Sequence, residues 1–427
     1  MEPSDQLAAA DRWAEAGDRF KYVPYNRPVT RGARSSEHNL QRRVLVGSIA
    51  SMIACIVLLP VAGQGVRARI DVRVSVAPAP FRGSDGQTHL AYELALTGLS
   101  GTGRAKLERV EVFGDAQTEP LVSYADSDLD QRAMRPEADR ETRYGRQVPG
   151  GTTTLIHVWI SLGANRAVPR RLRHSLVISA EDGSRVEAGD ARVDVQGPPL
   201  VIGAPFRTGA WLAHNGPGQH RSSHWGSALV STQGALIPQR YAIDFMGVDN
   251  DGRAVRGDFQ KSVNEDWIGF GQEVLAAADG VVHAARDGVA DNPPLVELPR
   301  TTSPSAEGTY GNYVIIAAAG RTFVHYAHLQ HNSVMVKTGQ AVRRGQLLGR
   351  LGNSGNSNAA HLHFNVTDGP LAEGAQGVPF VFDAFEWLGR TTAGRALGAE
   401  PSAEVFTFSP STRSKELTLD GVVVRYR

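Results

Sequence analysis

Two histidines near the end of the chain are spaced so that both could act on one site. His361 and His363 lie two residues apart in the strand-like run 360–366, and residues i and i+2 of a strand face the same side. At about 3.3 Å per residue the two imidazoles would lie roughly 7 Å apart. This spacing fits two metal ligands, or one ligand and one proton carrier. Taken alone, this pair is weak evidence for a site, and two solvated or structural histidines are the better interpretation.

Two further stretches favour the metal interpretation. Residues 324–329 predict a strand in which Tyr326 and His328 share a face, and residues 239–245 predict another, with Asp244 at the end of an apolar run. A carboxylate there needs a partner, because burying an unpaired charge is costly. Three histidines and an aspartate from three strands could therefore converge on two or three zinc ligands plus acid–base histidines.

The stretch from about 240 to 366 resembles the lysostaphin/LytM-type zinc endopeptidases, also called glycylglycine endopeptidases. The resemblance covers roughly a third of the chain, and the motifs that carry it follow the family's order. Each motif is weak alone, but together they are highly specific. The matching segments are Tyr241-Ala-Ile-Asp244, 271–282, 308–315, Tyr326-Ala-His-Leu329, 339–349, 352–355 and His361-Leu-His-Phe364.

The resemblance implies an all-β peptidase domain, a duplicated hybrid motif with a lipoyl-like sheet, that holds one Zn²⁺ ion. Asp244 and His363 would be zinc ligands, and His361 and His328 would flank the reacting water, take its proton and stabilise the oxyanion. Zinc lowers the pKa of a bound water towards about 7, and a neutral histidine suits the proton-accepting role. The family cleaves peptide bonds in the stems or cross-links of peptidoglycan.

One position departs from the family pattern. The family places its first ligand four residues before the aspartate, as H-x-x-x-D, and here that position is Arg240. A guanidinium stays protonated and does not ligate zinc. Either the site has lost its metal, or another histidine replaces the missing ligand.

His224 is the replacement that the sequence favours. If the chain turns back at Gly234 in a hairpin without a bulge, His224 lies directly across from Asp244, with Cβ atoms about 4.5–5.5 Å apart. Pro238 interrupts such a ladder, because it cannot donate a hydrogen bond. The position of His224 before the run 239–244 also resembles a branch of the family. In that branch a histidine precedes a strand ending Gln-Arg-(Tyr/Phe)-Ala-Ile-Asp. His220 and a site without metal remain open.

Other segments must carry and position this site. Residues 44–63 are uncharged and long enough to span a bilayer as a helix, so they predict a transmembrane anchor or a signal segment, with a buried core helix as the alternative. Residues 66–196 alternate polar and apolar side chains between Gly, Asp and Pro clusters, which predicts an antiparallel, immunoglobulin-like β-sandwich. The remaining parts are a polar flexible tail at 1–43, a linker at 197–222, the peptidase domain at 223–390 and a C-terminal strand tail at 391–427.

Composition excludes several classes of function. The 427 residues carry a formal net charge of +1, so no global basic excess points to a nucleic-acid partner. The single cysteine, Cys55, rules out an intramolecular disulfide and a Cys-rich zinc site. A lipoyl-type carrier is disfavoured, because such a carrier needs a modifiable lysine at the tip of a hairpin. Lys337 is the only nearby lysine, and it lies before the two Gly-Gln pairs at 339–340 and 345–346.

The sequence therefore predicts an all-β zinc metalloendopeptidase with catalytic His328 and His361 and metal ligands His224, Asp244 and His363. Its expected substrate is a peptidoglycan peptide or a protein. It would act outside the cytoplasm, in the cell envelope, membrane-anchored through its N-terminal segment or secreted. The alternative is a catalytically impaired relative that binds peptidoglycan or regulates another cell-wall hydrolase. Retention of four of the five site residues argues against it, since drift would remove several.

Overall fold

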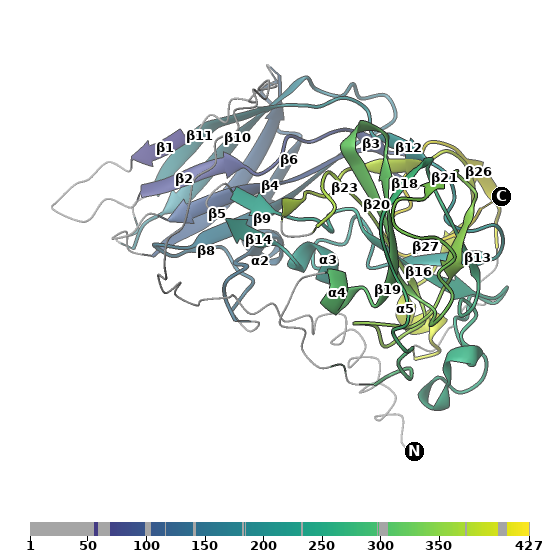
Figure 1. The fold of residues 1–427 in the computed structure, drawn as a ribbon. Helices are drawn as coiled ribbons and strands as arrows, with labels where there is room; N and C mark the ends of the chain where they lie inside the picture. The colour runs from purple at the N-terminus through teal and green to yellow at the C-terminus, as the bar shows by residue number, and fades with distance from the viewer. Residues whose placement is uncertain are drawn as a thin grey trace, which may run out of the picture.

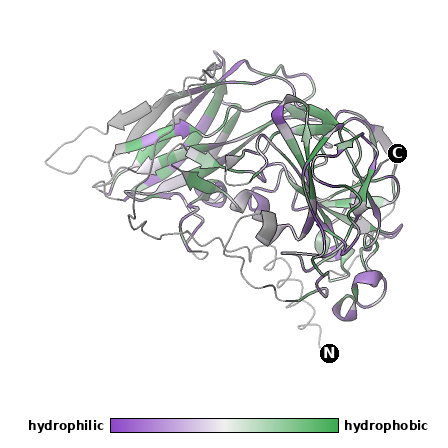
Figure 2. Ribbon diagram, viewed as in Figure 1, coloured by the Kyte–Doolittle hydropathy of each residue, from purple (hydrophilic) through white to green (hydrophobic). Residues whose placement is uncertain are grey.

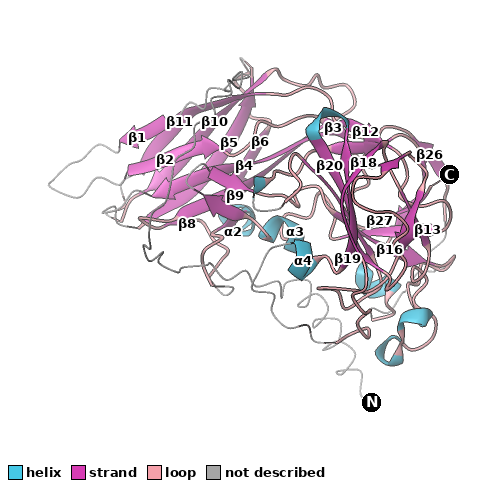
Figure 3. Ribbon diagram, in the orientation of Figure 1, coloured by secondary structure: helices cyan, strands magenta, loops and turns pink. Residues whose placement is uncertain are grey.

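The computed structural model describes residues 55–58 and 69–426, apart from short gaps. These gaps are 99–103, 116, 140–141, 182, 184, 232–233, 297, 299–305, 372–373 and 400–407. Strands dominate the described part of the chain, and its helices are short (Figure 3). This confirms the predicted all-β class.

The N-terminal unit is a sandwich of two antiparallel sheets, at the purple to blue end of Figure 1. Its polar–apolar alternation buries every second residue, as in β10, and the buried residues of both sheets form one core. The first sheet contains β1 (Cys55–Leu58), β2 (Arg69–Val74), β4 (Thr88–Gly98), β9 (Thr153–Leu162) and β7 (Ala133–Met134), in that order, with β3 (Phe81–Arg82) beside β4. The second contains β11 (Arg185–Asp194), β10 (Arg171–Ser179), β5 (Ala105–Gly114) and β6 (Val122–Ala125), with β8 (Gln147–Val148) beside β5. Helix α2 (Asp126–Arg132) follows β6.

The predicted membrane segment falls almost wholly outside the described residues. Of 44–63 only Cys55–Leu58 is described, and it forms β1, antiparallel to β2. Among the helices that the structure describes, none is both long enough and apolar enough to cross a membrane. The polar tail 1–43 also lies outside the described residues, so the anchor or signal segment stays a prediction.

The C-terminal unit is built on a ten-stranded sheet. Its strands are green in the hydropathy colouring over much of their length (Figure 2), and their apolar side chains form the largest core of the protein. The strand order is β21 (Ala341–Val342), β18 (Gly280–Arg286), β19 (Asn312–Ala318), β20 (Thr322–Leu329), β23 (Leu362–Thr367), β16 (Ile243–Val248), β13 (Ala210–His214), β27 (Val422–Arg425), β25 (Phe385–Arg390) and β26 (Ser411–Arg413).

Three two-stranded sheets and several short helices complete this unit. The sheets pair β12 (Leu200–Ile202) with β24 (Phe380–Phe382), β14 (Leu229–Ser231) with β15 (Gly234–Leu236), and β17 (Glu273–Leu275) with β22 (Leu347–Arg350). The helices are α3 (Ser223–Gly226), α4 (Ala306–Thr309), α5 (Ala393–Ala396) and the 3₁₀ turns η1 (Phe259–Lys261), η2 (Asn264–Asp266) and η3 (Ala319–Arg321).

The structure corrects two of the predicted boundaries. The supposed linker 197–222 contains β12 and β13, and β13 lies inside the main sheet. The supposed C-terminal tail contributes β27, which pairs with β13 and β25. The run 210–213, Ala-Trp-Leu-Ala, is fully apolar without alternation, because the strand is buried on both faces.

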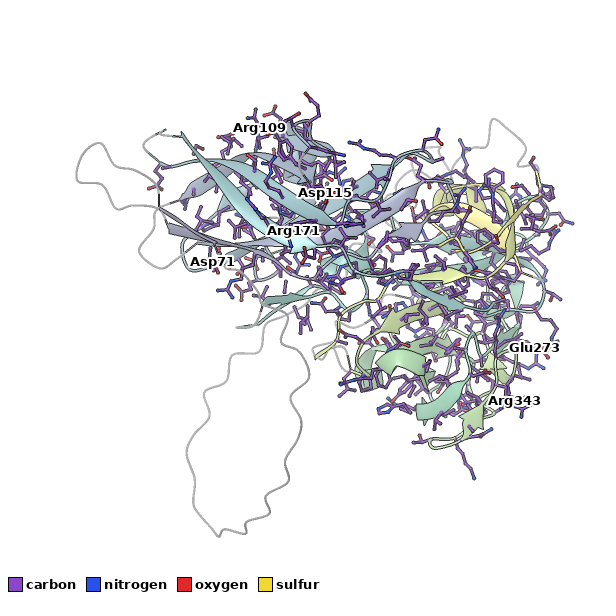
Figure 4. All side chains as sticks on the ribbon, turned by 90° about the horizontal axis from the view of Figure 1, so that it is seen from above. Asp71, Arg109, Asp115, Arg171, Glu273 and Arg343 are labelled. Atoms are coloured by element: carbon purple, nitrogen blue, oxygen red, sulfur yellow. The ribbon has the colours of Figure 1, made fainter. Side chains whose placement is uncertain are left out.

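The two units are in direct contact. Phe81 and Ala91 of the sandwich belong to the same core cluster as the ten-stranded sheet, and the Tyr241 hydroxyl donates to the Ala91 carbonyl at 3.1 Å. Figure 4 shows the side chains of both units, with Arg109 and Arg171 labelled on the sandwich and Arg343 on the C-terminal unit. The contact brings β4 close to the segment that precedes β16.

Candidate metal centre

The centre of the ten-stranded sheet positions the candidate site. Asp244 lies on β16 between β13 and β23, and its cross-strand partners are His214 and His363. Directly paired residues face the same side of a sheet, so the side chain of His363 lies beside that of Asp244. His361 immediately precedes β23 and reaches the same carboxylate. The predicted placement of both histidines on one side of their strand agrees with this geometry.

Three imidazoles surround one carboxylate oxygen. Asp244 Oδ1 lies 3.0 Å from His363 Nδ1, 3.3 Å from His224 Nε2 and 3.5 Å from His361 Nε2. His224, Asp244 and His363 each offer a ligand atom, and these atoms all lie within 4.8 Å of one another. All three residues are buried. The structure therefore brings together the three residues predicted as ligands.

His224 reaches the site by a different route from the predicted one. It lies on the single turn α3, which is capped by Ser222, whose hydroxyl accepts from the Trp225 backbone N–H. The hairpin that follows is short: β14 pairs with β15 in the register Leu229 to Leu236 and ends before Pro238. The predicted cross-strand pairing of His224 with Asp244 is therefore wrong, although the two side chains do meet.

A β-bulge aims His328 into the site. Asn312 pairs with Leu329 and Val314 with Tyr326, so β20 carries one extra residue at this point. His328 has a φ of 61°, a left-handed conformation that is uncommon outside glycine. Tyr326 points into the core, where its hydroxyl accepts from Ala277 N–H at 2.6 Å. The prediction that Tyr326 and His328 share a face is wrong, because the bulge turns His328 to the opposite side.

Backbone carbonyls fix the tautomers of the site histidines. A carbonyl oxygen can only accept, so the ring nitrogen bonded to it carries the proton. His224 Nδ1 donates to Asn215 O at 2.8 Å, His328 Nδ1 to Ser354 O at 2.8 Å, and His361 Nδ1 to Ala359 O at 2.8 Å. In the neutral rings Nε2 then carries the lone pair.

This arrangement fits a cation. The lone pair of neutral His224 faces the oxygen of Asp244 at 3.3 Å, and two acceptors at that distance need a proton or a positive ion between them. Two imidazoles and a carboxylate are a set of protein ligands found in catalytic zinc sites. The residues present therefore fit the zinc ion that the sequence predicts.

The pKa shifts of the site residues also favour an ionised carboxylate beside the histidines. Burial alone would raise the pKa of Asp244, but His224, His361 and hydrogen bonds from His224 and His363 hold it well below its usual value. Burial lowers the pKa of His224, and the Asp244 charge outweighs that effect and raises it. Burial, with His361 and His363 nearby, lowers the pKa of His328 well below its usual value. Asp244 is thus ionised, and His328 is neutral.

Sequence reasoning missed Asn215. Its side-chain amide donates to Asp244 Oδ2 at 3.2 Å and to Ser223 Oγ at 2.6 Å, and its carbonyl accepts from His224. Asn215 therefore hydrogen-bonds the second oxygen of Asp244, and Oδ1 is left facing the histidines. Its φ of 56° explains the residue type, because asparagine tolerates the left-handed region. The Asn-Gly-Pro-Gly run was the available signal, and it was interpreted as a linker.

The other residues considered as ligands lie outside the three-residue ligand group. His214, at the end of β13, is the cross-strand partner of Asp244. His220 is absent from the three-residue ligand group, and burial together with Arg132 lowers its pKa to about 4. Arg240, at the family's ligand position, forms a buried ion pair with Glu93 instead, with Nη2 2.6 Å from Oε2.

The family comparison agrees with this site in part. Residues 267–374 match Peptidase family M23. The predicted resemblance to LytM-type peptidases is thereby confirmed for this part of the chain. The match includes His328, His361 and His363, but it begins after His224 and Asp244. The assignment of those two residues therefore depends on the geometry described above.

Two curated relatives come from Vibrio cholerae. The peptidoglycan DD-endopeptidase ShyC is 33% identical over 111 residues, which cover 26% of this chain and 21% of that protein. The peptidoglycan DD-endopeptidase ShyA is 41% identical over 56 residues, 13% of each chain. The similarity thus spans about a fifth or less of either relative.

Solved structures of similar proteins include a zinc-containing peptidase from Vibrio cholerae. It is 15% identical, with 73% of this chain and 84% of that chain covered and a TM-score of 0.21. A putative glycyl-glycine endopeptidase LytM from Ruminococcus gnavus is 21% identical, with 32% of this chain and 42% of that chain covered and a TM-score of 0.19.

Proposed function

We propose that this protein is a zinc metalloendopeptidase that hydrolyses peptide bonds in peptidoglycan. One observation carries the proposal: His224, Asp244 and His363 are buried and each offers a ligand atom, and these atoms lie within 4.8 Å of one another. The match of residues 267–374 to Peptidase family M23 supports the same reaction class. His224, Asp244 and His363 would hold one zinc ion.

A zinc ion bound there would polarise the scissile carbonyl and lower the pKa of the attacking water. The chain's own residues supply the rest. His361 Nε2 lies 3.5 Å from Asp244 Oδ1, beside the ligand group, and its Nδ1–H is fixed on the Ala359 carbonyl. Its free lone pair is placed to take the proton of the water.

His328 faces His361 across the site, with ring centroids 4.8 Å apart. Its Nδ1–H is held by the Ser354 carbonyl, and burial keeps the ring neutral. The proton that His361 takes from the water would pass to His328 Nε2, and this nitrogen could then donate to the oxygen that develops negative charge. The positive φ of His328 fixes this orientation at some cost in backbone energy.

The proposed substrate is a peptide of the bacterial cell wall. Both curated relatives are named as peptidoglycan DD-endopeptidases. Such a substrate lies outside the cytoplasm, which agrees with the predicted anchor or signal segment at 44–63. We therefore place the protein in the cell envelope, membrane-anchored or secreted.

Digestion of purified peptidoglycan by the zinc-loaded full-length protein tests this proposal. Wild type should release uncross-linked muropeptides, detected by liquid chromatography and mass spectrometry. His361→Ala should keep zinc and lose at least about 10²-fold in rate, because it removes only a proton carrier. Zinc binding without any cleavage of peptidoglycan would favour the catalytically impaired alternative. A wild-type protein that binds no zinc would overturn the proposal.

A further inference from the structure

A buried glutamate of the sandwich lies at the contact with the candidate metal centre. Glu93 is on β4, and its side chain is fully buried. The Arg240 guanidinium donates to both carboxylate oxygens, with Nε at 3.0 and 3.1 Å and Nη2 at 2.6 Å from Oε2. Trp225 Nε1 donates to Oε1 at 3.1 Å. One carboxylate of the N-terminal unit therefore binds two residues of the C-terminal unit.

Both of those residues belong to segments that carry candidate ligands. Trp225 follows His224 directly on α3, and Arg240 lies four residues before Asp244. Glu93 thus connects the segment of the first ligand to the segment of the second. This connection crosses about 130 to 150 residues of sequence, so it exists only when the sandwich is docked.

Helix α3 cannot hold His224 in place by itself. A four-residue turn makes too few backbone hydrogen bonds to be stable alone. Its position depends on contacts on two sides. Asn215 binds His224 on the side of the site, and the sandwich binds the other side.

The sandwich side of this contact is extensive. Trp225 is buried in a small apolar cluster that contains residues of both units. Arg143 of the sandwich also donates to the carbonyl of Gly226, the last residue of α3, at 3.2 Å. The members of the cluster are Ala95, Met134 and Leu155 from the sandwich and Trp225, Ala228, Ala235 and Ile237 from the C-terminal unit.

We propose that Glu93 is a positioning residue for the metal ligand His224, so that the sandwich is a structural part of the metal centre. This inference rests on the proposed zinc site. Arg240, at the position where the family has its first ligand, takes a different role in this chain: it binds Glu93 and fixes the start of the strand that carries Asp244. His224 then supplies the missing ligand from a turn that the sandwich holds.

Glu93→Gln in the full-length protein tests this role, because it keeps the shape of the side chain and removes its charge. Tyr92→Phe is a matched control. Tyr92 is the neighbouring residue on β4, is equally buried, and bonds His174 within the sandwich at 2.6 Å. Both changes remove a buried polar contact of β4, but only Glu93 contacts the C-terminal unit. Circular dichroism first establishes that each variant is folded.

Three measurements separate positioning from general stability. Zinc affinity, from competition with a chelator, should fall about 10–100-fold in Glu93→Gln and stay near wild type in Tyr92→Phe, as for residues that orient metal ligands. The visible absorption of the Co²⁺-substituted protein should change only in Glu93→Gln. Amide hydrogen exchange of the metal-free protein should accelerate across 222–228 in Glu93→Gln alone.

The outcomes distinguish this inference from the zinc site itself. A folded Glu93→Gln protein with wild-type affinity, spectrum and exchange would overturn the inference, as would equal losses in Tyr92→Phe. If wild type binds no zinc, the zinc site fails, and the exchange measurement alone decides whether Glu93 holds α3. If Glu93→Gln does not fold, Trp225→Phe is the second variant. It removes the indole donor and part of the ring but keeps an aromatic side chain, and it should shift the Co²⁺ spectrum in the same direction.

Discussion

Replacing His224 by alanine tests the proposed ligand that lies outside the family's H-x-x-x-D motif. The change removes the imidazole whose Nε2 lies 3.3 Å from Asp244 Oδ1 and leaves Asp244 and His363 as the two protein ligands. Zinc binds protein sites with roughly 10–16 kcal/mol. Divided among three protein ligands, this is about 3–5 kcal/mol each. At about 1.4 kcal/mol per tenfold change, zinc affinity should fall about 10²–10⁴-fold.

His220→Ala is the control, because His220 is the other candidate for the replaced ligand and lies on the same segment, four residues earlier. It is not among the three residues whose ligand atoms converge, so its removal should change affinity by about twofold or less, as for substitutions away from a site. Competition against a chromophoric chelator measures both variants, after circular dichroism has shown that they are folded. Wild-type affinity in His224→Ala, or a large loss in His220→Ala, would refute the ligand assignment.

Three further predictions address orientation, catalysis and pH. Asn215→Gly keeps the left-handed backbone but removes the amide that binds Asp244 Oδ2, so zinc affinity should fall about 10–100-fold; unchanged affinity would show that the amide orients nothing. His328→Ala should lower kcat on peptidoglycan about 10²–10⁴-fold at unchanged zinc content, and loss of the metal instead would make it a ligand. Burial lowers the pKa of His174 from 6.5 to about 4. Between those values the unfolded chain binds the proton and the folded one does not, so stability present above pH 6.5 is lost on acidification. His174 should contribute about 2 kcal/mol to the loss between pH 7 and 5 in guanidinium denaturation, and the loss in His174→Leu should be smaller by about that amount.

The sequence predicts the parts of the site that lie on regular strands. His361 and His363 follow the two-residue period of β23, so their common direction could be inferred without the structure. His328 could not be placed this way, because a bulge is a one-residue irregularity of strand pairing that leaves no clear pattern in the sequence. The Tyr326-Ala-His-Leu329 motif, which resembles the family, identifies the residue, and only the structure shows which face it lies on.

The wrong assignment of β13 to a linker also has a cause in the local sequence. An apolar strand covered on both faces lacks alternation, and the Asn-Gly-Pro-Gly run that follows it is a strong turn signal. Because of these two features the sequence predicted a linker here, and neither the central strand β13 nor the role of Asn215 was predicted. Such a strand is identified by its partners β16 and β27, which lie about 35 and 210 residues further along the chain.

The position of His224 shows why a ligand outside the usual motif needs support from elsewhere. In an H-x-x-x-D motif, four residues of local chain hold the first ligand close to the aspartate. Here 20 residues separate His224 from Asp244, and ordering a loop of that length costs more conformational entropy than ordering four. That cost must be met by contacts that exist only in the folded protein. Asn215 supplies them from the residue directly after β13, and Glu93 and Trp225 supply them across the contact between the units. A chain without the sandwich would keep Asp244, His361 and His363 on their strands but lose the restraint on His224, so its metal affinity should fall even if its sheet folds.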